Sequence, residues 1–159
     1  MKHTIAVLVN DQPGVLQRVS GLFGRRGFNI ESITVGQSEE SGLSRMVIVT
    51  LGDQHTLEQI EKQLYKLIDV IKVVDLGSKP MVARELALIK VKADPANRPE
   101  IMGVVDTFRA SVVDIGSNSM LVQVVGESQK IDAIIDLMKP YGIKELSRTG
   151  VTAMIRGNA

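Results

Sequence analysis

One short segment combines residue types that suit the binding of a free amino acid. In residues 10–16 (Asn-Asp-Gln-Pro-Gly-Val-Leu), a turn cluster separates an apolar run from residues at helical spacing. The amides that begin a helix have no partners inside it and carry the positive end of its dipole, so they suit a carboxylate. Gly14 lets a ligand approach the backbone closely, and Asp11 can accept from an α-ammonium group. The same residues also fit an ordinary turn, in which Asp11 caps the helix and Gly14 relieves strain.

A second stretch, residues 26–32 (Arg-Gly-Phe-Asn-Ile-Glu-Ser), places polar side chains in a strand. Asn29 and Glu31 fall on one face, opposite Phe28 and Ile30. Asn is disfavoured inside strands, and its amide both donates and accepts. Asn29 is therefore a candidate for holding a ligand across an interface between two chains. An Asn at a β-bulge of an edge strand explains the same residue equally well.

The sequence lacks the residue patterns of common catalytic sites. The absence of cysteine excludes disulfides, thiolate nucleophiles and cysteine-based metal sites. His3 and His55 have no acidic or histidine neighbour at triad or metal-ligand spacing, so we expect both to lie at the surface. No nucleophile elbow, P-loop or HExxH motif occurs. The sequence thus predicts a binding protein rather than an enzyme, with no metal or cofactor of its own.

Composition excludes several other classes. The 159 residues are 44% hydrophobic and 23% charged, with a net charge of +1 and no basic block of the kind that binds nucleic acid. No apolar run approaches the ~18–20 residues of a membrane-spanning helix, and no signal peptide precedes the first strand-like run. We expect a cytoplasmic protein that binds neither nucleic acid nor membrane.

The hydrophobic pattern predicts a β-α-β-β-α-β order that occurs twice, which is the ferredoxin-like arrangement. Gly126-Glu127 and the apolar residues after it repeat the pattern of Gly52-Asp53, which supports an internal duplication. We therefore predict an α+β protein of two modules, residues 1–77 and 78–159; one continuous domain is the alternative. The expected elements are strands over 4–9, 28–35, 45–51, 70–76, 85–92, 111–115, 120–125 and 143–147, and helices over 15–23, 53–68, 98–108 and 129–138.

The first and third strands are apolar on both faces, although helices cover only one face of such a sheet. Something else must cover the second face. In a module of this size, the other module or a second chain is the available cover. We therefore expect a homodimer.

These segments resemble a known family. The pattern Asp11-x-Pro13-Gly14-x-Leu16 between strand and helix resembles the signature of ACT domains, which are ferredoxin-like modules that pair and bind amino acids at their interfaces. The runs 21–32, 44–46 and 57–64 are similar to the small regulatory subunit of acetolactate synthase (acetohydroxyacid synthase). The similarity covers the whole chain and is densest over residues 5–77; residues 114–115, 147–150 and 156–157 also resemble that family.

The resemblance implies a regulatory role in branched-chain amino acid biosynthesis. The first module (1–77) would bind an amino acid and dimerise, and the second (78–159) would be the C-terminal module of the small subunit. The chain would activate a separate catalytic subunit that carries thiamine diphosphate, Mg²⁺ and FAD, and would confer feedback inhibition by valine, leucine or isoleucine. A stand-alone amino-acid-responsive regulator is the alternative.

The family's effector site lies between the first modules of two chains. Carried over to this sequence, one chain contributes Asp11, Gly14, Val15 and Leu16, and the other contributes Asn29 and Ile30. Amides around Gly14 and Val15 would hold the effector carboxylate and Asp11 its ammonium group. Leu16 and Ile30 would line a pocket for a branched side chain.

Overall fold

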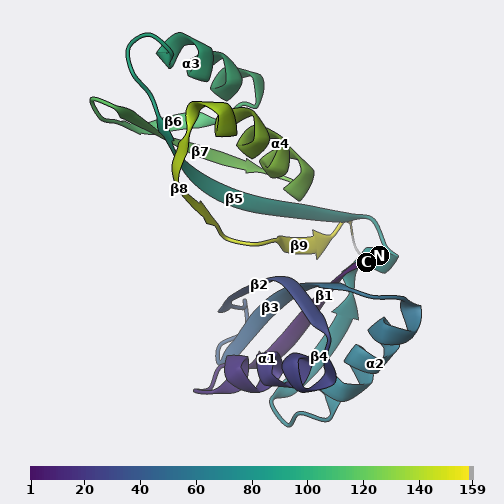
Figure 1. Ribbon diagram of the computed structural model, residues 1–159. Helices are drawn as coiled ribbons and strands as arrows, with labels where there is room; N and C mark the ends of the chain where they lie inside the picture. The colour runs from purple at the N-terminus through teal and green to yellow at the C-terminus, as the bar shows by residue number, and fades with distance from the viewer. Residues whose placement is uncertain (158–159) are drawn as a thin grey trace. The chain divides into compact units, whose positions relative to one another are not determined.

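A computed structural model describes residues 1–157 and divides the chain into two compact units (Figure 1). The first unit contains Met1–Val82 together with the segment that begins at Val151, and the second contains Ala83–Gly150. The expected boundary near residue 77 therefore differs from the structural division, because the end of the chain returns to the first unit. No helix among residues 1–157 is long and apolar enough to cross a membrane.

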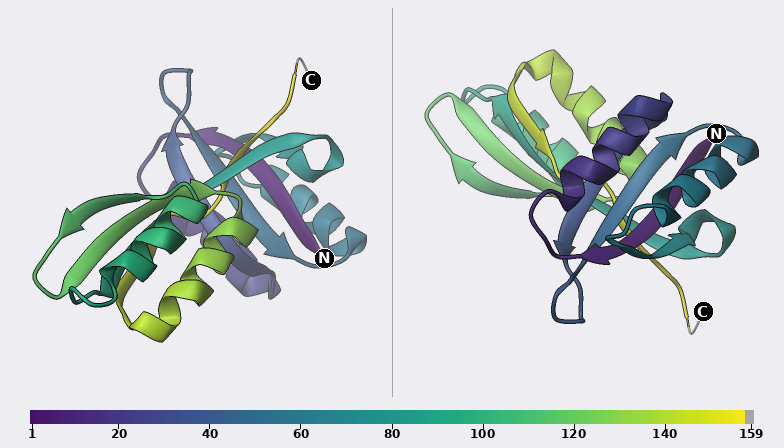
Figure 2. Two further views of the ribbon diagram at one scale, coloured as in Figure 1. Left: turned by 90° about the horizontal axis from the view of Figure 1, so that it is seen from above. Right: turned by 90° about the horizontal axis from the view of Figure 1, so that it is seen from below.

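Each unit is an antiparallel sheet with two helices, which confirms the predicted ferredoxin-like order. Figure 2 shows, most clearly for α3 and α4, that the helices lie side by side on one face of their sheet. The strand orders are β2-β3-β1-β4 in the first unit and β6-β7-β5-β8 in the second. The elements of the first unit are β1 (Lys2–Asn10), α1 (Val15–Arg26), β2 (Asn29–Gln37), β3 (Leu43–Leu51), α2 (Gln54–Tyr65), β4 (Val70–Asp75), the short 3₁₀ helix η1 (Leu76–Ser78) and, at the chain end, β9 (Thr152–Ile155).

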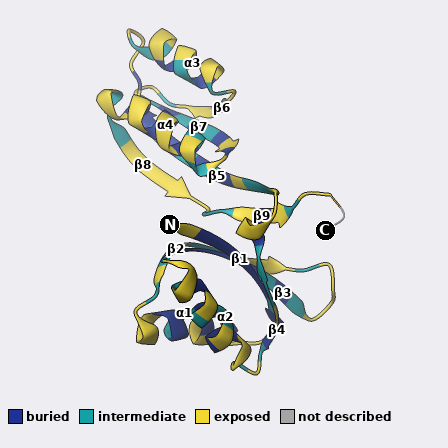
Figure 3. Cartoon of the chain, turned by 90° about the vertical axis from the view of Figure 1, so that its right-hand side faces the viewer, coloured by how far each residue is buried: buried dark blue, intermediate teal, exposed yellow. Residues whose placement is uncertain are grey.

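The core of the first unit lies between the sheet and its helices (Figure 3). Alternate residues of β1 and β3 point to this side because side chains in a strand alternate between the two faces. They meet the apolar stripes of α1 and α2. The fully buried members include Ile5, Val7, Phe23, Ile48 and Leu64.

The opposite, outer face of this sheet is also buried, and the chain covers it by itself. Ala6, Val47 and Val49 belong to this face and are buried together with Leu76 of η1 and Ala153 of β9. β9 lies within the predicted second module, residues 78–159, but the structure groups it, like η1, with the first unit. The covered face therefore gives no evidence for a dimer.

Three hydrogen bonds hold the end of the chain on this outer face. Arg45 Nη2 donates to the Ala153 carbonyl at 2.8 Å. The Thr34 hydroxyl donates to the Val151 carbonyl, and the Val151 amide donates to the Ser32 hydroxyl, both at 3.3 Å. β9 was not predicted, although the run Val-Thr-Ala-Met-Ile at 151–155 has the composition of a strand.

The second unit repeats the plan of the first. Its elements are β5 (Met81–Lys92), of which the first two residues belong to the first unit, α3 (Arg98–Thr107), β6 (Ser111–Ile115), β7 (Ser119–Gly126), α4 (Ser128–Met138), the 3₁₀ helix η2 (Lys139–Tyr141) and β8 (Ile143–Arg148). Ile89, Ile101, Val122 and Ile131 are fully buried in its own separate core.

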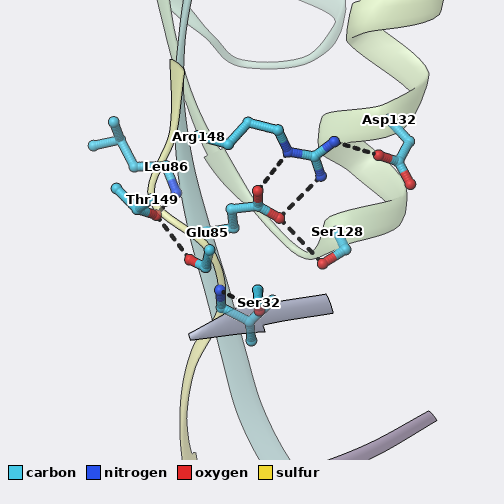
Figure 4. A network of polar contacts seen from close by, with 9 residues as sticks. Ser32, Glu85, Leu86, Ser128, Asp132, Arg148 and Thr149 are labelled. Atoms are coloured by element: carbon cyan, nitrogen blue, oxygen red, sulfur yellow. Dashed lines mark hydrogen bonds and ion pairs between the residues drawn. The ribbon is translucent and has the colours of Figure 1, made fainter. Parts of the chain in front are cut away.

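A buried carboxylate ties three elements of the second unit together (Figure 4). Glu85 of β5 is only 5% exposed, and Arg148 of β8 binds it through Nε at 2.5 Å and Nη2 at 3.1 Å. Two residues of α4 complete the network. Asp132 accepts from Arg148 Nη1 at 2.8 Å, and the Ser128 hydroxyl donates to Glu85 at 3.1 Å. The Glu85 carboxylate, which accepts these hydrogen bonds, raises the pKa of the Arg148 guanidinium. Glu85 and Asp132 are thus both paired with Arg148, and the buried carboxylate of Glu85 has the partner that a buried charge requires.

Candidate functional site

The candidate site begins where β1 ends and α1 starts, and we call residues 11–14 and the first turn of α1 the α1 corner. The Asp11 amide donates to the Gly42 carbonyl at 2.9 Å, and the Gln12 amide donates to Asn10 at 3.0 Å. Gly14 precedes the helix with a φ of 85°, in the left-handed region that favours glycine. The turn therefore requires the glycine that the sequence places there.

The first turn of α1 has no side-chain cap. Asp11 does not close the helix, so the interpretation of this segment as an Asp-capped turn was wrong. Among residues 1–157, no acceptor is found for the amides of Leu16 and Gln17, whereas the Val15 amide makes a long bond of 3.4 Å to Gln12. The corner thus presents free donors and the positive end of a helix dipole, which together attract an anion.

The start of α2 in the same unit is closed by its own residue. Asp53 accepts from the Thr56 amide at 2.8 Å, and this hydrogen bond lowers the pKa of the Asp53 carboxyl. A helix start that is capped in this way has fewer free amide donors for a ligand. The α1 corner therefore differs from the start of α2, whereas the N-cap residues of α3 and α4 also make no side-chain cap.

A cation that the sequence analysis missed lies beside the α1 corner. Arg18 is held by Asp69, which accepts from Nε at 2.9 Å and from Nη2 at 2.6 Å. A β-carbon placed on Gly14 would lie 2.9 Å from Arg18 Nη1, so this third nitrogen lies against the glycine. The spacing of four residues between Gly14 and Arg18 was the available signal, because such residues share a helix face.

Val15 and Leu16, the two apolar residues of the α1 corner, differ in burial. Val15 is 4% exposed and belongs to the core, so only its backbone is accessible. Leu16 is 46% exposed and is free to contact a ligand. Of these two, Leu16 is the one whose side chain can line a pocket.

Asn29 and Ile30 lie far from the α1 corner within one chain. Asn29 begins β2 and is opposite Leu51, which is opposite Lys2 at the start of β1. The corner follows the other end of β1, which is nine residues long, so about 26 Å separates the two groups at 3.3 Å per residue. Asn29 is exposed, whereas Ile30 is half-buried and packs against the core. One chain by itself does not bring the six predicted residues together.

The histidines lie outside both groups. His55 is exposed as expected, but His3 is buried, with its Nε2 3.0 Å from the Gly52 carbonyl oxygen. The expectation of a surface position was therefore wrong for His3, whose strand buries successive residues on both faces.

Two family models together match nearly the whole chain. Residues 5–72 match the model described as "AHAS small subunit-like ACT domain", and residues 84–157 match "Small subunit of acetolactate synthase".

Curated relatives align from end to end. A probable acetolactate synthase small subunit from Archaeoglobus fulgidus is 56% identical over 158 residues, covering 99% of both chains. An acetolactate synthase small subunit from Bacillus subtilis is 53% identical, covering 99% of this chain and 92% of the relative. The crystal structure of the acetolactate synthase small subunit from Thermotoga maritima superposes with a TM-score of 0.92 at 44% identity, covering 100% of this chain and 99% of the other.

Proposed function

The chain belongs to the family of acetolactate synthase small subunits, and from this premise we propose that it is the regulatory subunit of an acetolactate synthase. In this role it activates a separate cytoplasmic catalytic subunit and makes that subunit sensitive to valine or another branched-chain amino acid. The reaction and its cofactors, thiamine diphosphate, Mg²⁺ and FAD, belong to the catalytic subunit. The present chain contributes binding and no catalytic group.

The observation that carries this proposal is the open α1 corner. The amides of Leu16 and Gln17 and the Arg18 guanidinium offer donors for a carboxylate, and Asp11 offers an acceptor for an ammonium group. Both charged ends of an amino acid therefore find partners within one turn of chain. The exposed Leu16 supplies an apolar contact for the ligand's side chain.

The separation of Asn29 from the corner favours a site shared by two chains. β2 is an edge strand, and a two-fold axis that sets two β2 strands antiparallel brings the Asn29 end of one chain to the corner end of the other. The other edge strand, β4, is less open to pairing. The Tyr65 hydroxyl donates to the Val73 carbonyl at 3.3 Å and accepts from the Val73 amide at 2.9 Å. These contacts favour β2 as the dimer edge.

A shared site explains how binding regulates activity. An effector held by both chains stabilises the dimer geometry that closes the pocket. If the catalytic subunit is more active with the other geometry, the effector inhibits it, and a coupling of about 1–3 kcal/mol changes the affinity about 5–150-fold. A methylene more or less in the pocket changes binding by only about 1–3 kcal/mol, so we expect modest discrimination among valine, leucine and isoleucine.

The decisive experiment combines the purified chain with a purified acetolactate synthase catalytic subunit. We expect the chain to increase the rate of acetolactate formation and valine to reverse the increase. The catalytic subunit alone, with and without valine, is the control. No change in rate on addition of the chain would contradict the regulatory role, and activation without a response to any branched-chain amino acid would contradict the effector site.

A further inference from the structure

Apolar side chains are exposed close together where α2 passes into β4. Three of the large exposed apolar residues of the described chain, residues 1–157, fall between positions 65 and 71: Tyr65, Ile68 and Ile71. Ile68 is 92% exposed. Single exposed apolar residues are ordinary, but several close together mark a surface that another molecule covers. We call residues 62–72 the α2–β4 surface.

The fold itself holds Ile68 outside. Leu67, before it, packs against the core of the first unit, and Val70, after it, is buried. The Leu67 amide donates to the Leu64 carbonyl at 3.0 Å, and the Val70 amide donates to the Leu67 carbonyl at 3.1 Å. Ile68 could turn inward only if these neighbours left the core. Its exposure therefore exists before any partner binds, and a partner would find it preorganised.

Basic side chains flank this apolar cluster. Lys62, Lys66 and Lys72 are exposed, and they form no ion pair within residues 1–157. Asp69 is the acidic residue of the surface, and its carboxylate is paired with Arg18. An apolar centre with a basic rim fits a partner whose own apolar patch has an acidic rim.

The charges argue against a second copy of this chain as that partner. In a two-fold dimer the same surface faces itself, so lysines would meet lysines. The surface also lies away from the edge that we propose for the dimer, because β4 and β2 are the two opposite edges of the sheet. Pairing of two β2 strands therefore leaves the α2–β4 surface free.

Asp69 connects this surface to the α1 corner. Its carboxylate accepts from Arg18 Nε at 2.9 Å, and its carbonyl accepts from the Asn10 amide at 2.9 Å. The turn that presents Ile68 is thus bonded to the helix and to the strand end that border the corner. A partner on this surface would lie next to groups that respond to an effector, as expected for a subunit whose activity the effector controls.

We propose that the α2–β4 surface docks the catalytic subunit of the acetolactate synthase. Ile68 enters an apolar pocket of that subunit, and the three lysines face carboxylates around it. The identity of the partner rests on the proposed function, whereas the surface that holds the partner is the new element.

The test measures binding of the full-length chain to a purified, immobilised catalytic subunit, together with activation of acetolactate formation. Ile68→Asp should raise both the dissociation constant and the concentration for half-maximal activation at least about tenfold. Because Ile68 is exposed, the variant should keep the wild-type midpoint of urea unfolding. The matched control is Leu137→Asp, which changes an exposed apolar residue of α4 and should leave binding and activation unchanged.

A second pair of variants tests the basic rim. Lys66→Glu combined with Lys72→Glu should weaken binding at least about tenfold at low salt, and the loss should shrink at high salt because ions screen the attraction. Lys79→Glu combined with Lys144→Glu changes exposed lysines outside the surface and should keep binding within about twofold.

Unchanged binding in Ile68→Asp, or in the variant with both rim lysines replaced, would overturn the proposal. Co-sedimentation of the wild-type chain with phosphatidylglycerol vesicles that Ile68→Asp abolishes would also overturn it, because the surface would then contact a membrane. If the wild-type chain binds the catalytic subunit without activating it, the proposed function fails, whereas loss of that binding in Ile68→Asp still supports the docking surface.

Discussion

Gly14 and Arg18 determine what the α1 corner can hold. The glycine sustains a positive φ, and its missing side chain leaves room for Arg18 Nη1. The arginine keeps one nitrogen free of Asp69, because Asp69 accepts from Nε and Nη2 only. The two residues thus combine an open backbone with a guanidinium nitrogen that Asp69 leaves free.

Replacing Gly14 by Asp should abolish the valine response and preserve activation of the catalytic subunit. The new carboxylate would lie among the free amides and beside Arg18, and would exclude the effector carboxylate. Valine inhibition curves of the reconstituted enzyme measure the effect. Gly103→Asp is the matched control, because this glycine of α3 has open space around it. Retained valine sensitivity in Gly14→Asp would count against the site.

Arg18→Gln should weaken valine binding about ten- to a hundredfold, because a hydrogen bond from a charged donor contributes about 1.5–3 kcal/mol. Isothermal titration calorimetry on the full chain measures the affinity. The control is Arg25→Gln, since Arg25 lies against Gly21 in the last turn of the same helix, away from the corner. Equal affinity in the two variants would remove Arg18 from the site.

At the scale of elements, β9 completes the first unit from the far end of the chain. Its backbone accepts from Arg45, and the neighbouring Val151 is bonded to Ser32 and Thr34 of β2. β2 also carries Asn29, so the strand proposed to form the dimer edge is supported by the end of the chain. A fragment that ends near residue 77 would expose the outer face of its sheet.

Ala153→Asp should destabilise the first unit by at least about 2 kcal/mol, because it forces a larger and charged side chain into a position that is 3% exposed. Met154→Asp is the matched control, since this next residue of β9 is 64% exposed. Urea denaturation followed by circular dichroism measures both free energies of unfolding. Similar free energies for the two variants would mean that β9 does not cover the sheet in solution.

At the scale of the whole molecule, a site shared by two chains has a consequence that a site within one chain lacks. If the α1 corner of one copy works with Asn29 of the other, each dimer has two sites, and each site draws one half from each chain. A mixed dimer of two different defective chains then places both defects in one site and leaves the other site intact.

Mixing Gly14→Asp with Asn29→Ala chains, by co-refolding, should therefore restore valine binding that neither variant has alone. Half of the dimers are mixed after random pairing, and one of their two sites is intact, so about a quarter of the wild-type sites should return. The control mixture is Gly14→Asp with Leu16→Asp, whose defects lie in the same half and should restore nothing. Calorimetric stoichiometry distinguishes the outcomes, and no recovery in the first mixture would argue against a shared site.

The sequence alone determined the β-α-β-β-α-β order of both modules and the start of a helix after the Pro13-Gly14 turn, whereas the structure showed that this helix start has no side-chain cap. These features depend on local causes: the alternation of apolar residues in β1 and β3, the helical spacing from Val15 to Phe23, and the turn residues between them. Its prediction of two ferredoxin-like modules was confirmed for the same reason.

Only the tertiary structure decided which residues distant in sequence meet. It placed Asp69 on Arg18, laid β9 over the outer face of the first sheet, buried His3 and put Asn29 at the opposite end of the sheet from the α1 corner. Each of these outcomes depends on strand register and on the path of the chain between units. Periodicity reveals which face of an element is apolar, but the partner of that face is set by the packing of the whole chain.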